Sequence, residues 1–205
     1  MLKTKELSNL TEWLDKYPLF HSGDEVDEVR HKVGGIFVPH HLRVLGQQQH
    51  LSANMNHLQL DNTSVNTLGY GAGVNISCDP FEQFLLIMLP MTGVMHATVE
   101  DGVVEAHKNV AALINTSDPL SMKWGENCNQ LIIRINKALI ARTCETLLGH
   151  PVKDDVKFSS ALQMAQGNDM YQSIIHLLAT NPFISESAKL YPIITKQLEQ
   201  LLVSS

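Results

Sequence analysis

The sequence predicts a mainly β protein, a sandwich or barrel with helical segments on both sides. From residue 35 to Ile135, short apolar or alternating runs are separated by turn residues at intervals of about ten, which is typical of sandwiches and barrels. Before and after this region, apolar residues recur at helical spacing. We therefore expect an N-terminal helical segment over 1–34, a β domain over 35–135 and a C-terminal helical segment over 136–205.

Two helices are predicted in the first segment. An amphipathic helix over 6–16 ends before Pro18, because proline cannot continue it. Its apolar positions are Leu7, Leu10, Trp13 and Leu14. A second helix over 24–32 has acidic residues in its first turn, where the helix dipole favours them, and we expect Gly34 and Gly35 to end it.

Ten strands are predicted in the middle segment. Asp101-Gly102, between two alternating runs, is the sharpest hairpin signal. The run from Gln83 to Leu89 is apolar at every second position on both faces, which predicts a strand buried on both sides. The predicted strands are 42–45, 51–60, 64–70, 74–77, 83–89, 94–99, 103–106, 111–114, 120–124 and 130–135.

Helical periodicity returns after Asn136 and predicts helices over 138–148, 170–179 and 188–203. Gly149 follows the first of them, at the position where glycine ends helices. The last helix has an apolar stripe with near-heptad spacing, which suits either packing on the chain's own sheet or a helix pair between two subunits. The stripe consists of Leu190, Ile194, Leu198 and Leu201.

Composition excludes several classes of protein. Fifteen basic against 21 acidic residues give a net charge of −6, and no part of the chain has the basic cluster that a duplex-binding surface needs. No window approaches the roughly 18 apolar residues of a membrane helix, and the first residues lack the apolar run of a secretory signal. We therefore expect a cytoplasmic protein with no membrane partner.

Cysteines and histidines do not form a recognisable metal or catalytic motif. The cysteines Cys78, Cys128 and Cys144 lack a C-x-x-C pair and are interpreted as buried thiols. His40 and His41 are adjacent, so a strand would point them to opposite faces. No H-x-H and no G-x-S-x-G occur. The sequence therefore predicts no metal, no cofactor and no enzymatic chemistry.

A barrel interior can hold one small ligand, and polar or aromatic side chains within apolar strands are the candidates that would orient it. For each of them, an ordinary core position satisfied by backbone or water is the competing interpretation. The candidates from this argument are His57, Tyr70, His96, Trp124 and Arg134.

The order of five motifs resembles the regulatory domain of AraC/XylS-type bacterial transcription regulators, specifically the AraC-binding-like subfamily. The resemblance extends from about Asp24 to Leu202. The motifs are Pro39-His40-His41-Leu42, Leu68-Gly69-Tyr70-Gly71-Ala72, Leu89-Pro90-Met91-Thr92-Gly93, Leu120-Ser121-Met122-Lys123-Trp124 and the run from Cys128 to Arg134.

This resemblance implies a cupin-like β-barrel, or double-stranded β-helix, that senses a small organic effector, followed by helices that form a homodimer. It adds His40, His41 and Arg43 to the ligand-binding candidates. Relatives often have an arginine at the position of His41, where a guanidinium suits a carboxylate ligand. His41 is largely neutral near pH 7, which disfavours an aromatic-acid effector here.

Relatives also carry a C-terminal module with helix-turn-helix motifs that binds DNA and recruits RNA polymerase. No basic module of that kind is present in the 205 residues, so we expect DNA and RNA polymerase to be partners only through a module outside this chain. The predicted function is effector sensing and dimerisation in a transcription regulator. Two alternatives stay open: a ligand-independent interaction protein and a cupin-type enzyme.

Overall fold

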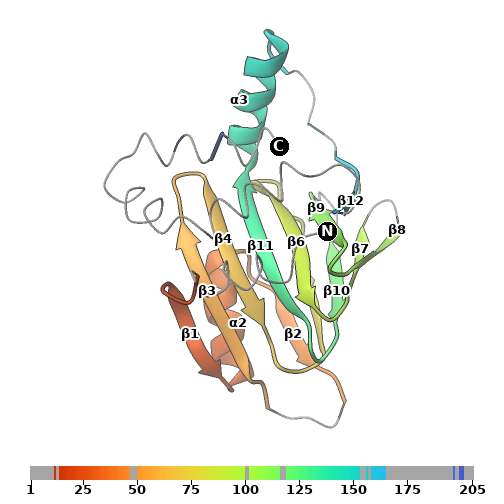
Figure 1. Cartoon of the computed structure of the whole chain (residues 1–205). Coiled ribbons are helices and arrows are strands. Elements are labelled where there is room, and N and C mark those ends of the chain that lie inside the picture. Colours follow the sequence, from red (N-terminus) through yellow and green to blue (C-terminus); the bar gives the residue numbers. More distant parts are fainter. Residues whose placement is uncertain are drawn as a thin grey trace.

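The computed structural model describes residues 12, 14–46, 50–99, 102–115, 119–152, 156, 158–164, 196, 199 and 200. Within these residues the chain forms strands β1 to β12 and helices α2 and α3 (Figure 1). The strands are β1 (Pro18–Gly23), β2 (His41–Val44), β3 (Ala53–Gln59), β4 (Thr63–Gly69), β5 (Val74–Cys78), β6 (Phe84–Thr92), β7 (Met95–Val99), β8 (Gly102–Ala106), β9 (Val110–Ile114), β10 (Leu120–Trp124), β11 (Asn129–Asn136) and β12 (Ala161–Gln163). The helices are α2 (Val26–Ile36) and α3 (Lys137–Leu148).

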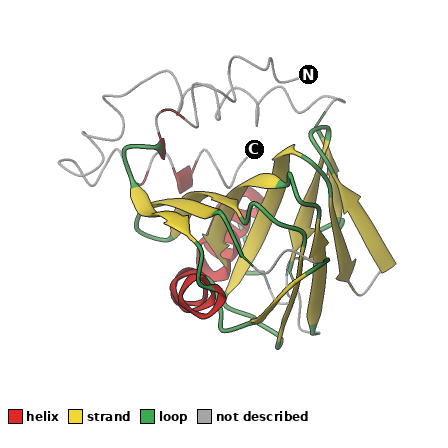
Figure 2. Cartoon of the chain, turned by 90° about the horizontal axis from the view of Figure 1, so that it is seen from below, coloured by secondary structure: helices red, strands yellow, loops and turns green. Residues whose placement is uncertain are grey.

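The described strands form two antiparallel sheets that face each other (Figure 2). The larger sheet has the order β1-β3-β4-β11-β6-β9-β12, and the smaller sheet has the order β2-β5-β10-β7-β8. Helix α2 packs against β1 of the larger sheet and β2 of the smaller one, and so covers one side of the sandwich. The mainly β prediction is confirmed, but the expected barrel is a sandwich of two separate sheets.

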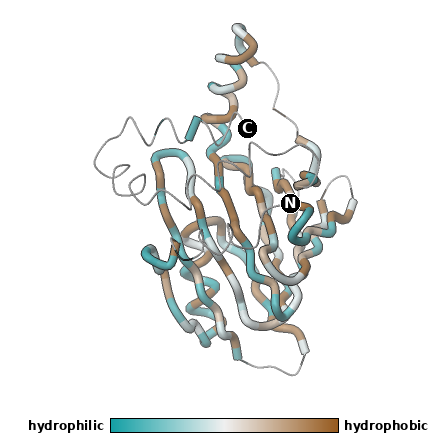
Figure 3. The backbone as a smooth tube through the Cα atoms, viewed as in Figure 1, coloured by the Kyte–Doolittle hydropathy of each residue, from teal (hydrophilic) through white to brown (hydrophobic). Residues whose placement is uncertain are grey.

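The main core lies between the two sheets. Strand β6 is buried from Phe84 to Pro90, as its apolar run predicted, and Figure 3 shows hydrophobic residues along β6 and β11. Alternation directs Phe84, Leu86 and Met88 into the space between the sheets. The opposite side chains of β6 belong to a second apolar cluster on the outer face of the larger sheet.

That second cluster receives residues from both ends of the chain. Leu14 and Met164 are buried in it, and Ile140 joins it from α3. At the turn between β3 and β4, the backbone N–H of Asn62 donates to the Glu199 carboxylate, and Asn62 Nδ2 donates to its other oxygen at 3.1 Å. Glu199 is buried by this contact. Glu199, six residues from the end of the sequence, is therefore held against the β3–β4 turn of the larger sheet.

All ten predicted strands are present in the structure; nine have limits within two residues of the expected ones, and β6 runs three residues further, to Thr92. Two additional strands were missed, because β1 lies in the segment expected to be helical and β12 lies among the expected C-terminal helices. The second predicted helix is longer than expected. Helix α2 runs through Gly34 and Gly35 to Ile36, since burial of Val29 and Val33 against the sandwich offsets the low helix propensity of glycine.

The predicted hairpin forms between β7 and β8, but β8 begins at Gly102, one residue earlier than expected from the strand pattern.

The predicted helix over 170–179 lies outside the described residues, as do most of 6–16 and of 188–203. Of the described residues in those two predicted helices, five are helical, namely Glu12, Leu14, Lys196, Glu199 and Gln200, whereas Asp15 and Lys16 form a turn, so the first helix ends before its predicted limit. The stripe of Leu190, Ile194, Leu198 and Leu201 also lies outside them.

Helix α3 is capped at both ends, and of these two caps the sequence analysis predicted the one at Gly149. The side chain of Asn136 accepts a hydrogen bond from the backbone N–H of Ala138 at 2.9 Å, and Gly149 adopts the left-handed conformation with φ 73°.

Asn136→Ala should lower the free energy of unfolding by about 1 kcal/mol, because it removes the N-terminal cap of α3. Urea denaturation measures the change. Asn136→Asp keeps an acceptor and is the control, so equal losses in both variants would contradict a capping role.

Candidate functional site

An apolar cavity lies between the two sheets. It has about 40 Å³ of space open to water-sized molecules. The inward side chains of β10 line it along the whole strand, opposite residues of β4, β6 and β11, while the end of α2 and the residues after it form one wall. The lining residues are Val33, Phe37, Val38, His40, Leu68, Tyr70, Ile76, Cys78, Phe81, Leu86, Met88, Leu120, Met122, Trp124 and Ile132.

Two aromatic side chains bring polar groups into this apolar space. Trp124 and Tyr70 are each 1% exposed, and their rings meet edge to face with centroids 5.2 Å apart. Trp124 Nε1 is buried without a hydrogen-bond partner among the described residues. Burial raises the pKa of the Tyr70 hydroxyl, which therefore stays a neutral donor. The wall of the cavity thus includes a buried indole N–H that has no partner among the described residues.

His40 supplies an acceptor at the other end of the cavity. Its Nδ1 donates to the carbonyl of Val38 at 2.9 Å, which leaves Nε2 as the unprotonated nitrogen of the neutral ring. Nε2 is buried and has no partner in the described part of the chain. Burial is the main cause that lowers the pKa of His40, so the ring is neutral at pH 7.

A wider cleft adjoins the cavity at the end where β2 and β10 begin and β5 ends. It has a volume of about 590 Å³ and shares His40, Cys78 and Leu120 with the inner cavity. The residues that line the cleft include one basic side chain, Arg30, and one acidic side chain, Asp79. Arg30 is already paired with Asp27 at 3.0 Å. A molecule can therefore approach the inner cavity through a polar mouth without a strong net charge.

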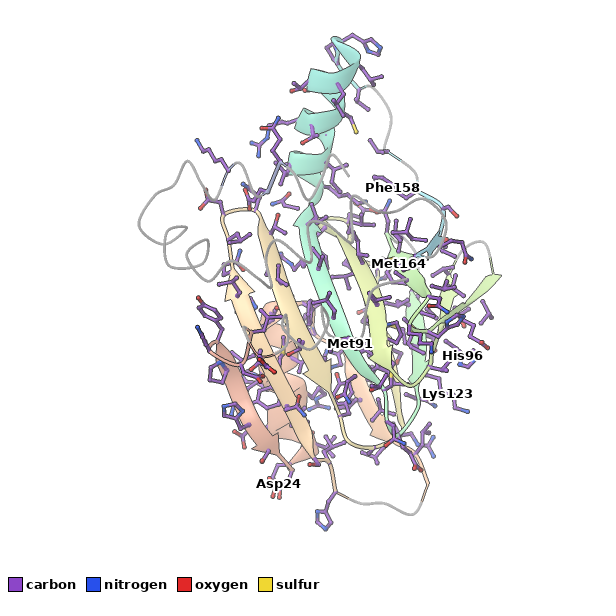
Figure 4. All side chains as sticks on the ribbon, viewed as in Figure 1. Asp24, Met91, His96, Lys123, Phe158 and Met164 are labelled. Atoms are coloured by element: carbon purple, nitrogen blue, oxygen red, sulfur yellow. The ribbon has the colours of Figure 1, made fainter. Side chains whose placement is uncertain are left out.

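Four of the eight predicted ligand-binding residues lie at these two spaces. His40, Tyr70 and Trp124 line the inner cavity, and His41 lines the cleft. Arg43 and His96 are exposed on the smaller sheet, outside both spaces. His96 Nε2 is 3.0 Å from the carboxylate of Glu105 on the neighbouring strand. Figure 4 shows His96 near Lys123, its partner in the register of β7 and β10.

His57 and Arg134 face the space between the sheets but do not line the cavity. His57 is half-buried, and its Nδ1 donates to Asn66 Oδ1 at 2.6 Å, so its ring is satisfied within the protein. The guanidinium of Arg134 lies over the ring of Phe84, 4.3 Å from its centroid, and burial lowers its pKa. Phe84 in turn stacks on Phe81, which lines the cavity. Arg134 is thus separated from the cavity by aromatic side chains.

Several site residues carried no signal in the sequence. Cys78 joins the cavity to the cleft, and burial raises the pKa of its thiol, so it acts as an apolar wall. Arg30 comes from α2 and Asp79 from the loop after β5. These residues meet only because the strand ends and α2 converge at one end of the sandwich. Alternation in β10 would have indicated Met122 as an inward residue.

Comparison with known proteins decides the family. The model of the AraC-binding-like domain matches residues 29–205, most of the chain. This chain belongs to the AraC-binding-like domain family. The resemblance deduced from the five motifs is therefore confirmed, and the chain is a regulatory domain of the AraC type, not an enzyme.

Several solved structures are similar to parts of this chain. The AraC-like transcriptional activator CuxR superposes with a TM-score of 0.58 at 12% sequence identity, over 80% of this chain and 60% of the CuxR chain. The chain thus spans less than two thirds of that relative. The cupin domain of Schizosaccharomyces pombe Cnp3 matches with a TM-score of 0.36 and 13% identity, over 48% of this chain and 68% of that domain.

An RmlC-like cupin protein from Desulfovibrio desulfuricans matches with a TM-score of 0.30 and 12% identity, over 40% of this chain and 81% of that protein. No curated protein sequence matches the chain significantly.

Among the described residues, no three His, Cys, Asp or Glu side chains lie close enough together to hold a metal ion. None of the described helices has the length and apolar character needed to cross a bilayer.

Proposed function

We propose that this AraC-binding-like domain senses a small organic effector in the cavity between its sheets. The observation that carries the proposal is the apolar cavity that opens into the cleft and is lined by Trp124 and His40, each of which has a buried nitrogen without a partner among the described residues. Buried polar groups normally have partners, so unpartnered ones in a cavity indicate a binding site. Tyr70 completes the polar lining, and His41 lies at the entrance.

Strand β11 provides a route from the cavity to the C-terminal segment. Ile132 lines the cavity, and four residues later Asn136 caps α3. An effector that displaces Ile132 therefore shifts the strand on which α3 is built. The domain then has two arrangements of its C-terminal helices. The effector shifts the equilibrium between them only if it binds one arrangement more tightly than the other.

In this proposal, residues 35–135 are the sensor and residues 136–205 connect it to a partner. The stripe of Leu190, Ile194, Leu198 and Leu201 forms a homodimer, and a DNA-binding module outside this chain contacts DNA and RNA polymerase in the cytoplasm. CuxR, an AraC-like transcriptional activator whose chain is longer than the matched part, supports this arrangement.

A variant that blocks the passage between the cleft and the cavity tests the proposal. A metabolite library is screened by thermal shift against the wild-type chain, since a ligand that binds only the folded state raises Tm. Cys78→Phe fills the junction of cleft and cavity, and should abolish the shift for compounds that bind inside. Asn75→Phe, exposed on the same strand, is the matched control and should keep it. Circular dichroism verifies that both variants fold.

The size of the cavity favours a second candidate, a ligand-independent interaction protein. Its volume of about 40 Å³ is well below the roughly 150 Å³ of an engineered cavity that binds benzene. In this alternative the sandwich is only a scaffold, and the same C-terminal helices pair with another regulator. A library in which every stabilising compound is unaffected by Cys78→Phe would favour the scaffold.

A further inference from the structure

Glu199 is the only buried acidic or basic side chain in the part of the chain that the structure describes, with 1% of it exposed. Both oxygens of its carboxylate accept hydrogen bonds from a single residue, Asn62 in the turn between β3 and β4. The backbone N–H of Asn62 donates to one oxygen, and its Nδ2 donates to the other at 3.1 Å. Lys196, Glu199 and Gln200 are helical, and we call the segment that carries them the C-terminal helix. One turn residue thus holds this helix by its carboxylate.

The buried carboxylate has no cationic partner in the described part of the chain. None of the ion pairs among the described residues includes Glu199. A carboxylate that leaves water without meeting an opposite charge depends on hydrogen bonds to offset the cost of desolvation. The two bonds from Asn62 have this role here. Loss of one of them should therefore favour the hydrated carboxylate, which makes this contact more easily reversed than an apolar contact of the core.

The turn that receives Glu199 is held by bonds of its own. The N–H of Leu60 donates to the carbonyl of Thr63 at 2.8 Å, and Gln59 Nε2 donates to the same carbonyl at 3.3 Å. Neither bond involves the C-terminal helix. The turn therefore keeps its shape when the helix leaves, and the helix is the part that moves.

Asn62 also supports the start of α3. Its carbonyl accepts a hydrogen bond from the backbone N–H of Asn136 at 2.9 Å, and the Asn136 side chain caps α3 by accepting from the N–H of Ala138. Asn62 is thus bonded to the C-terminal helix through its N–H and side chain, and to the capping residue of α3 through its carbonyl. Connected hydrogen bonds polarise one another, so breaking the bonds to Glu199 weakens the bond to Asn136.

We propose that Asn62 and Glu199 form a latch that holds the C-terminal helix in one arrangement, and that Asn62 transmits the state of the latch to the start of α3. In the released arrangement, water hydrates the Glu199 carboxylate and the two donors of Asn62. The inference rests on the proposed function in one respect, because it takes the C-terminal helices to have two arrangements. It goes further by identifying the contact that distinguishes them, and it requires no ligand in the cavity.

Reversing the roles of the two side chains tests the latch. Asn62→Asp keeps the size of the side chain but places a second carboxylate against Glu199, so it should release the helix. Adding Glu199→Gln restores an amide–carboxylate pair in which each position has taken the other's role. Asn75→Asp adds the same charge at an exposed position of β5 and is the matched control. Amide hydrogen exchange of the ligand-free chain, followed by NMR, measures release.

Asn62→Asp should raise the exchange rates of the amides of residues 196, 199 and 200 at least about tenfold, as expected for the loss of one hydrogen bond to a charged group. The double variant should return these rates to within about threefold of the wild type, because the pair is restored. Asn75→Asp should leave them unchanged. The amides of β11, the middle strand of the larger sheet, should keep their protection in every variant and so verify the fold.

Glu199→Ala tests the transmission to α3, because it breaks the latch without changing the turn. The N–H of Ala138, which donates to the Asn136 side chain, should exchange at least about threefold faster in this variant. The N–H of Gly149 donates to the Glu145 carbonyl at the other end of α3. It is the internal control and should keep its rate.

The outcomes separate the latch from effector sensing. Unprotected amides at 196, 199 and 200 in the wild type, unchanged rates in Asn62→Asp, or no rescue in the double variant would each overturn the latch. A released helix with an unchanged rate at Ala138 would overturn its transmission to α3. None of these results affects the thermal-shift screen, which tests the cavity. A working latch in a protein that no library compound stabilises would support this inference and contradict effector sensing.

Discussion

Gly93→Ala should lower the free energy of unfolding by about 3 kcal/mol, one of the largest effects expected from a single methyl group in this protein. Gly93 has φ +71°, where a side chain costs about 1–2 kcal/mol. An added Cβ would also lie 2.7 Å from Cys128 Cα and 2.8 Å from the Asn127 carbonyl oxygen. These are backbone atoms that cannot rotate away, so overpacking adds about 1–3 kcal/mol.

The loop around Gly93 has little freedom to relax. Thr92 Oγ1 donates to the Asn127 carbonyl at 2.7 Å, and Asn129 Nδ2 donates to Thr92 Oγ1 at 3.2 Å. These bonds hold the β6–β7 turn against the loop before β11. The matched control is Gly46→Ala, since Gly46 has φ +78° but open space around it. Urea denaturation should show a loss of about 1 kcal/mol for the control. Equal losses for both variants would show that close packing at Gly93 has no energetic effect.

Asn66→Leu should lower the free energy of unfolding by about 3 kcal/mol. Asn66 is fully buried on β4, where its Nδ2 donates to Ser64 Oγ and to the Ile132 carbonyl, both at 3.0 Å. Its Oδ1 accepts from His57 Nδ1. The substitution removes all three bonds and leaves buried polar groups unpaired, which costs more than the bonds themselves contribute.

The neighbouring Thr67 provides a matched control. Thr67 is also buried on β4, and its hydroxyl accepts one bond, from Asn56 Nδ2 at 3.0 Å. Thr67→Val keeps the shape of the side chain and should cost about 1 kcal/mol. Denaturant unfolding of both variants decides the comparison. If Asn66→Leu proves no more destabilising than Thr67→Val, the three bonds of Asn66 do not act as a network.

Most strands could be predicted because each one carries its own local signal. In β10, the alternation of Leu120, Met122 and Trp124 with polar residues identifies both the strand and its inward face. The same rule applied to β2 and β7 would have placed Arg43 and His96 outward, because Leu42, Met95 and Ala97 are their inward neighbours. The position of a polar residue in the alternation therefore distinguishes inward-facing candidates from exposed ones.

β1 and α2 were predicted poorly because their conformations depend on contacts with distant residues. Phe20 of β1 is paired with Met55 of β3, and the register shifts twice within six residues, so no regular alternation exists to detect. Helix α2 continues past Gly34 because it packs on β1 and β2. The local propensities of their residues do not favour these conformations, and contacts with distant strands stabilise them instead.

The sequence by itself determined the ten central strands, helix α3 with its Gly149 cap, and the family, since periodicity, turn residues and ordered motifs are local properties. Only the tertiary structure decided that the strands form two sheets, and that His40 and Trp124 lie at opposite ends of one cavity. Those residues are 84 positions apart in the chain. They share a cavity because β2 and β10 both pair with β5, a pairing that arises from packing over long separations and leaves no local pattern in either segment.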